Sequence, residues 1–358
     1  MDIENLLLTG GSEGLFVGDG SSVTGVNLKA EGNWYSGITV DNNSSLFVWD
    51  GDAIGNGVWG IHAAGSSNVT LSGATEWVTG RPFVVSGNGA DGIGADRAVV
   101  SILGGVTVED NVESGIRLNP GTLAMGSYIP AENLIQHNPV GVVIMEGAQA
   151  SFWGPNTIKE NGVGVQAIIG SEVTFYEVVM PAGSVTLVEG NTSSGVEVSS
   201  NSAAWFFGHN KILNNGSTTD PLRAGIRVDG TSHALFEGGN EISGNTGPGI
   251  VADVNSSLDI WDTTISGNSE EGIRVRHMSI AEVQGSTATA GNGGGPLACD
   301  GSSLVISSLF AKTAKCANIE GAPSGPKPRT ASMMRVAPNV RFMVQEARRA
   351  AERFKAPK

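Results

Sequence analysis

The 358-residue chain lacks the long apolar run that a membrane-spanning helix needs. No stretch of about 18 consecutive apolar residues occurs, and residues 1–8 have neither the basic start nor the apolar core of a secretion signal. Positive charge is also scarce, with 21 Lys and Arg against 35 Asp and Glu. These absences predict a protein without a transmembrane segment and disfavour nucleic acid as a partner.

Metal-binding and nucleophilic motifs are equally sparse. The two cysteines, Cys299 and Cys316, do not form a CxxC pair, and the five histidines show no clustering along the sequence. The sequence therefore predicts neither a metal site nor a cofactor, and no Ser-His-Asp set is indicated.

A repeat dominates what is present. A glycine followed mostly by an aliphatic residue recurs twelve times, and seven of the eleven intervals are 23 or 24 residues long. The longer intervals indicate the same unit with inserted loops. These anchor glycines are Gly14, Gly37, Gly60, Gly92, Gly115, Gly141, Gly164, Gly195, Gly225, Gly249, Gly272 and Gly295.

Apolar residues alternate with polar ones after each anchor, as in Ile226, Arg227 and Val228. This period of two is typical of a strand. A second apolar pair follows nine and eleven residues after the anchor, and a third apolar point follows at sixteen or seventeen. Each unit is therefore expected to supply three short strands.

Asparagine precedes the anchor by three or four residues in ten of the twelve units. Asparagine tolerates the backbone of tight corners, and its amide can bond the Asn of the next unit. The anchor glycine removes a side-chain clash there. The ten are Asn33, Asn56, Asn88, Asn111, Asn138, Asn161, Asn191, Asn245, Asn268 and Asn292.

Three strands per unit, with no helical period between them, resemble the right-handed parallel β-helix of the pectate-lyase-like superfamily over roughly residues 10–310. The resemblance implies an all-β fold, a single-stranded right-handed parallel β-helix of about 12 coils. It is unspecific for activity, because that superfamily includes lyases, hydrolases, epimerases, tailspikes and adhesins. A homotrimer, as in tailspikes, stays an open alternative that nothing in the sequence supports.

Two domains are expected: a β-helix over residues 1–320, and a Pro-rich linker with a basic amphipathic helix over residues 321–358. The second segment carries nine Lys and Arg against two acids, so residues 1–320 carry −14 − 7 = −21. The helix is expected to cap or lie along the acidic coils; a solvated tail and a membrane-surface or partner helix are the alternatives.

Both ends of the coil stack need protection. An unpaired first coil leaves backbone groups open, so we expect a cap and an export signal upstream of the given sequence. At the other end, Cys299 and Cys316 are close to one coil apart. A disulfide fastening the last coil is favoured over two unpaired thiols, and it would place the protein in an extracellular or periplasmic compartment.

Charged residues gather on the outward row of the later coils. In enzymes of this fold the equivalent face lines a polysaccharide groove, where lyases need a cation and a basic residue and hydrolases need two carboxylates. Asp229 and Asp253 could form such a pair. The candidate catalytic residues are Glu197, Arg227, Asp229, Asp253, Arg274 and Arg276. The alternative is a salt-bridge ladder on a solvated surface, favoured because the signatures of known families are missing.

Aromatic residues recur twelve positions after the anchor and could stack on sugar rings, or could fill a corner of the coil. The candidate substrate-binding residues are Trp49, Trp153, Tyr176 and Trp261, with Arg117 from the outward row. The favoured function is therefore an exported or surface scaffold that binds a carbohydrate polymer. The alternative is a polysaccharide lyase, glycoside hydrolase or epimerase that uses the face from Glu197 to Arg276.

Overall fold

The computed structural model describes residues 1–73, 81–127, 131–177, 184–307, 309–310 and 319–320. Within these ranges every regular element is a β-strand, and no helix suited to crossing a membrane occurs among them. The chain divides into two compact units, residues 1–321 and 322–358. The linker and amphipathic helix expected over residues 321–358 lie outside the described residues, so that assignment stays a prediction.

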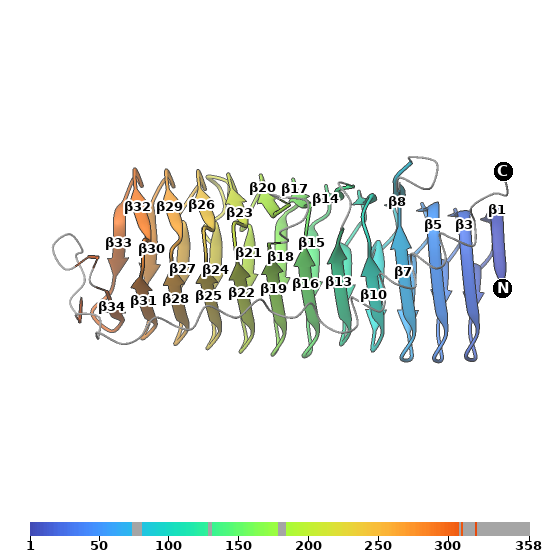
Figure 1. Ribbon diagram of the computed structural model, residues 1–358, viewed down its shortest axis with the longest axis horizontal. Helices are drawn as coiled ribbons and strands as arrows, with labels where there is room; N and C mark the ends of the chain where they lie inside the picture. Colours follow the sequence, from blue (N-terminus) through green and yellow to red (C-terminus); the bar gives the residue numbers. More distant parts are fainter. Residues whose placement is uncertain (74–80, 128–130, 178–183, 308, 311–318, 321–358) are drawn as a thin grey trace. The chain divides into compact units, whose positions relative to one another are not determined.

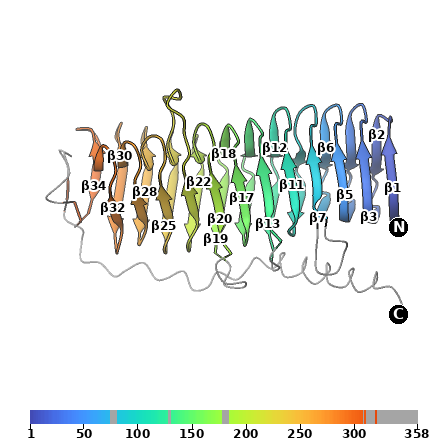
Figure 2. The same ribbon diagram turned by 90° about the horizontal axis from the view of Figure 1, so that it is seen from above.

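The described strands wind into a parallel β-helix, in which coil follows coil in sequence order along one axis (Figures 1 and 2). One face is a parallel sheet of twelve strands, one from each coil. Its strands are β2 (Glu13–Val17), β4 (Ser36–Val40), β6 (Trp59–Ala64), β9 (Ile93–Asp96), β12 (Ser114–Leu118), β15 (Val140–Ile144), β18 (Val163–Ala167), β21 (Val196–Val198), β24 (Ile226–Val228), β27 (Ile250–Ala252), β30 (Glu271–Val275) and β33 (Gly295–Cys299).

The remaining strands form two further faces that belong to one 23-stranded sheet, because the long strands of the first coils bend across both. The second face contains β1 (Asp2–Thr9), β3 (Ser22–Glu31), β5 (Ser45–Ile54), β7 (Asn68–Ser72), β10 (Val99–Ile102), β13 (Thr122–Gly126), β16 (Gln149–Trp153), β19 (Glu172–Tyr176), β22 (Ala203–Phe207), β25 (His233–Glu237), β28 (Ser257–Trp261), β31 (Ile280–Gln284), β34 (Leu304–Ile306) and β35 (Ile319–Glu320).

The third face contains the short strand that closes each later coil. These strands are β8 (Phe83–Ser86), β11 (Val106–Glu109), β14 (Asn133–Gln136), β17 (Asn156–Lys159), β20 (Thr186–Glu189), β23 (Lys211–Leu213), β26 (Glu241–Ser243), β29 (Thr264–Ser266) and β32 (Ala288–Ala290). Three strands per coil, and therefore the predicted architecture, are confirmed.

Side chains about one coil apart in sequence stack inside the solenoid. Ile226 pairs in register with Ile250, and Ile250 pairs with Ile273. Four phenylalanine rings form a continuous buried stack, with centroids 5.1, 4.7 and 4.6 Å apart. They are Phe152, Phe175, Phe206 and Phe236. Each such pair contributes about 0.5–1.5 kcal/mol beyond its buried area.

The anchor glycines are required by the closeness of neighbouring coils. A Cβ added at any anchor from Gly14 to Gly249 would lie 2.4–2.7 Å from the carbonyl oxygen of the next anchor. Such contacts are shorter than real Cβ atoms show. The repeat of glycine is therefore a packing requirement of the parallel stack.

The asparagines form one unbroken ladder from Asn33 to Asn292. Each side-chain Nδ2 donates to Oδ1 of the next asparagine at 2.8–3.1 Å. The ladder includes Asn215, which the sequence pattern missed because an inserted segment separates it by ten residues from its anchor Gly225.

Cys299, at the end of β33, is disulfide-bonded. Cys316, the partner expected from the sequence, lies outside the described residues.

Candidate functional site

The outward row of the twelve-stranded sheet has the register expected from the repeat. Glu197 pairs with Arg227, Arg227 with Val251, and Val251 with Arg274. Asp229 and Asp253 occupy equivalent places one coil apart, since their backbone N–H groups donate to Val198 and Val228 respectively, each at 2.8 Å. The structure therefore brings the predicted charged residues to one face.

The arginines of this face have acidic partners. Arg227 Nη2 lies 2.8 Å from Asp229 Oδ2 within the same coil. Arg274 Nε donates to Glu271 Oε2 at 2.9 Å, and its Nη2 also contacts Glu270. Both acids precede Arg274 by three or four residues, so the partners of Arg274 come from its own coil.

Asp253 is the most enclosed of the candidate acids, with only 4% of its surface exposed. It accepts hydrogen bonds from Arg276 Nε at 2.9 Å and from the backbone N–H of Val254 at 3.0 Å, and its other contact is His277 Nδ1 at 2.5 Å. Burial alone would raise its pKa, but the hydrogen bonds from His277 and Arg276 outweigh burial and hold the pKa below its ordinary value. Asp253 is therefore a paired carboxylate.

Asp300 follows Arg276 in the same row, one coil on, and the sequence did not single it out. It accepts the backbone N–H of His277 at 2.7 Å and the hydroxyls of Ser303 and Ser302, each at 2.8 Å. These hydrogen bonds hold the pKa of Asp300 far below its ordinary value. Glu197, the remaining acid, accepts a hydrogen bond from Gln166 Nε2 at 3.1 Å.

Arg117 is also engaged with acids. Its Nε donates to Asp91 Oδ2 at 2.8 Å and its Nη2 to Glu113 at 3.0 Å. The hydrogen bond to the buried Asp91 raises the pKa of Arg117 above its usual value. A sugar contact through Arg117 would have to compete with this pair of carboxylates.

The predicted line of aromatic rings is not an exposed surface. Trp49 and Trp153 are only 3% and 6% exposed, so they cannot present a ring face to a sugar. Tyr176 and Trp261 are half-buried, and Tyr176 stacks on Phe207 with centroids 5.8 Å apart. For Trp49 and Trp153 the structure corrects the expectation, because both rings are covered by neighbouring residues although Tyr176 and Trp261, at the same position of the repeat, stay half-buried.

Exposed rings gather instead on the first three coils. Trp34 is 82% exposed, Phe16 55% and Tyr35 44%, while Trp59 is half-buried. We call Phe16, Trp34, Tyr35 and Trp59 the aromatic surface. The signal is present in the sequence, since Trp34 and Tyr35 directly follow the ladder asparagine Asn33, but these two rings do not stand at the twelfth position of the repeat.

Ring contacts fix part of this aromatic surface. Trp59 stacks on His62 with centroids 4.2 Å apart and an angle of 13°, and Tyr35 meets Trp59 edge-on at 5.1 Å. Gly94 leaves room for Trp59, because a Cβ there would lie 3.2 Å from the indole Nε1. Trp59 is thereby held in one orientation, while Trp34, the residue adjacent to Tyr35, is largely exposed to solvent.

Comparison with known proteins agrees with the observed fold. Residues 154–310 match a protein family described as the right handed beta helix region. Together with the coil geometry, the match confirms the resemblance drawn from the sequence: the chain contains a right-handed parallel β-helix.

No curated protein matches the chain. Similar solved structures include two modules of mannuronan C-5 epimerases from Azotobacter vinelandii. The AlgE6 A-module is 10% identical, with 85% of this chain and 91% of that chain covered and a TM-score of 0.49. The AlgE4 A-module is 12% identical, with 84% and 91% covered and a TM-score of 0.37.

Proposed function

We propose that the protein is an exported β-helix scaffold that binds a neutral polysaccharide through the aromatic surface. The observation that carries the proposal is the exposure of Trp34, Tyr35 and Phe16 on neighbouring coils. Large apolar side chains exposed together mark binding surfaces, and flat aromatic faces suit the apolar C–H faces of sugar rings. Tyr35 and Trp59, which come from successive coils, meet edge-on at 5.1 Å, so rings of neighbouring coils lie close enough to contact one glycan chain.

Charge favours a neutral glycan. Residues 1–320 carry a net charge of −21, which repels polyuronates at long range. Close to the aromatic surface, Glu13 accepts a hydrogen bond from Thr39, and Asp96 lies 3.7 Å from His62. A neutral glycan, unlike a polyuronate, can bind without an unpaired arginine or lysine on the protein surface. The disulfide at Cys299 supports an oxidising compartment and hence export.

Binding without turnover is preferred because the candidate catalytic face is internally neutralised. Asp253 is held by Arg276 and His277, and Asp229 by Arg227. These pairs support the salt-bridge ladder as the role of that face. Incubation with a polysaccharide panel, followed by assays for reducing ends and for unsaturated products, checks this choice. If the protein turns over a polysaccharide and Asp229→Asn or Asp253→Asn abolishes that activity, the proposed binding function is wrong and the protein is an enzyme.

The binding proposal is tested by affinity electrophoresis and calorimetry with neutral polysaccharides. Trp34→Ala should weaken binding about tenfold, which corresponds to about 1.4 kcal/mol. Trp261→Ala, which removes a half-buried indole from a distant coil, is the matched control and should leave affinity unchanged. Equal affinity of Trp34→Ala, Tyr35→Ala and the parent protein would rule out the aromatic surface as the binding site.

A further inference from the structure

The residue just before each ladder asparagine has a left-handed backbone, with φ between 54° and 66° in eleven successive coils. Seven of these residues are glycine and one is Asn214. In three consecutive coils the position holds Asp110, His137 and Glu160. Three residues with ligating side chains thus replace the glycine that other coils use at the same corner.

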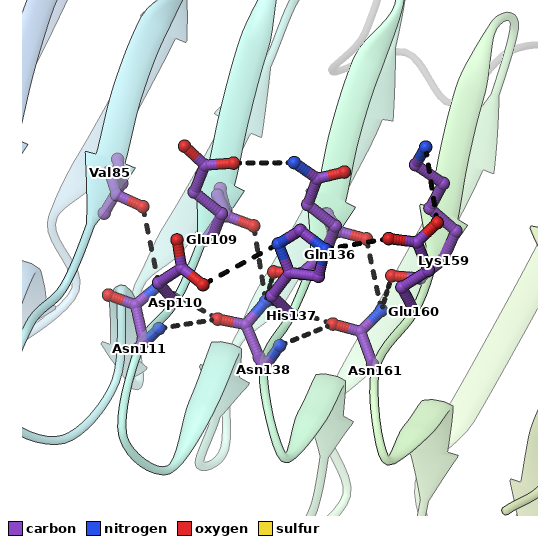
Figure 3. Close-up of polar contacts among 12 residues, drawn as sticks. Val85, Glu109, Asp110, Asn111, Gln136, His137, Asn138, Lys159, Glu160 and Asn161 are labelled. Atoms are coloured by element: carbon purple, nitrogen blue, oxygen red, sulfur yellow. Dashed lines mark hydrogen bonds and ion pairs between the residues drawn. The ribbon is translucent and has the colours of Figure 1, made fainter. Parts of the chain in front are cut away.

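The stacking of the coils brings these side chains together. Figure 3 shows the His137 ring between the carboxylates of Asp110 and Glu160. His137 Nε2 lies 2.8 Å from Glu160 Oε2, and His137 Nδ1 lies 3.7 Å from Asp110 Oδ1. Glu109, the last residue of β11, adds a third acid. Ligand atoms of Glu109, Asp110 and His137 all lie within 4.8 Å of one another.

The two sides of the imidazole differ. The contact with Glu160 is hydrogen-bonded and favours a proton on Nε2, which leaves the Nδ1 lone pair directed toward Asp110. The 3.7 Å separation from Asp110 is too long for a hydrogen bond. This is the arrangement of a carboxylate that orients a metal-bound histidine through its second nitrogen.

We propose that Glu109, Asp110 and His137 bind a divalent transition-metal ion of the Zn²⁺ type, with Glu160 as the residue that orients His137. Tetrahedral ligands at bond lengths of 2.0–2.1 Å lie about 3.3 Å apart, so a small inward movement of the half-buried Glu109 and of the exposed Asp110 and His137 completes the site. An imidazole ligand selects such ions over Ca²⁺ and Mg²⁺, which prefer oxygen alone. Water fills the fourth position.

Neighbouring side chains support this geometry. Gln136 Nε2 donates to Glu109 Oε2 at 2.7 Å and so restrains the Glu109 carboxylate. Lys159 Nζ lies 3.8 Å from Glu160 Oε1. The positive charge of Lys159 therefore lies beside Glu160, the residue that orients His137. The site is separate from the aromatic surface and goes beyond the proposed glycan binding.

The test is calorimetric titration of Zn²⁺ into the full chain without an affinity tag, together with thermal melting with and without Zn²⁺. The parent should bind one Zn²⁺ at this site and melt at a higher temperature with it. Asp110→Asn and His137→Gly should each lower the affinity for this ion at least about tenfold, and Glu160→Gln about tenfold. Ca²⁺ should give no comparable effect.

His137→Gly separates a binding role from a structural one, because glycine is the residue that other coils use at this corner. Without Zn²⁺ this variant should melt at or above the parent temperature, while losing the rise with Zn²⁺. His209→Ala removes another exposed histidine, whose Nδ1 lies 2.7 Å from Glu177 Oε2, and should bind Zn²⁺ like the parent. Zn²⁺ binding that survives His137→Gly, absent Zn²⁺ binding, or an equal response to Ca²⁺ would each overturn the proposal.

Discussion

Asn111 donates two hydrogen bonds to a single oxygen of Asn138, from its backbone N–H at 3.0 Å and from its side-chain Nδ2 at 3.1 Å. Asn138 repeats the pattern toward Asn161, at 3.0 and 3.1 Å. Each asparagine therefore satisfies a buried backbone donor of its neighbour, which a residue without a side-chain carbonyl cannot do. The ladder couples the corners of successive coils.

Asn138→Ala should destabilise the solenoid by about 2–6 kcal/mol, because it leaves two buried donors without an acceptor and each costs about 1–3 kcal/mol. The two orphaned donors belong to Asn111, so hydrogen exchange of the Asn111 amide should accelerate most. Asn68→Ala, at an exposed position of β7, is the control and should melt like the parent. Unchanged protection of the Asn111 amide would show that the ladder bond contributes nothing to stability.

Gly115→Ala should be destabilising by about 1–3 kcal/mol or more, as expected for overpacking. The added methyl group would lie 2.7 Å from the carbonyl oxygen of Gly141 and 3.0 Å from Asn138 Nδ2. Gly301→Ala offers a matched control, since a Cβ there meets nothing within 4 Å. The melting temperatures of the two variants compare them directly, and equal values would contradict the packing explanation.

The coil architecture could be predicted from the sequence because it depends on short-range regularities. The glycine anchors, the alternation around Ile226 and Val228 and the corner asparagines each recur with every coil, so errors at single positions do not matter. Asn215 shows the limit, because an inserted segment places it ten residues before Gly225 and so outside the spacing that the other ladder asparagines share. In space the ladder is continuous, because insertions leave the corner in register.

The candidate sites were less predictable, since they depend on the direction and partners of individual side chains. The repeat placed Asp253 on the outward face, but not its contact with His277, which lies one coil further on. Similarly, the spacing of His137 from Asp110 and Glu160 equals a coil, yet only the structure shows that the three share a corner. The twelfth position of the repeat holds the buried Trp49 as well as the half-buried Trp261, so the exposure of a ring depends on its neighbours and not on its place in the repeat.

Truncation of two phenylalanines, Phe206 and Phe16, should affect the stability of the protein to very different extents. Phe206→Ala removes a fully buried ring from the stack between Phe175 and Phe236 and should cost about 3–5 kcal/mol. Phe16→Ala removes a 55% exposed ring and should leave the melting temperature close to that of the parent, while weakening glycan binding. A large loss of stability in Phe16→Ala would instead make that ring part of the core.

The stability contributed by Asp253 should depend on pH in a defined direction. The pKa of this carboxyl is lower in the folded protein than its ordinary value of 3.8, because the hydrogen bonds from His277 and Arg276 outweigh burial. The folded state thus favours the ionised form, so the contribution is fully present above about pH 4 and is lost as the pH falls through the folded-state value. Asp253→Asn should therefore melt below the parent at pH 6, and the difference should shrink steadily as the pH is lowered from 4 to 2.5.

Asp19→Asn, which removes an exposed carboxylate, is the control and should follow the parent across the range. A difference between parent and Asp253→Asn that stays constant down to pH 2.5 would show that the ion pair with Arg276 and His277 does not stabilise the fold, and that the loss in the variant comes from packing alone.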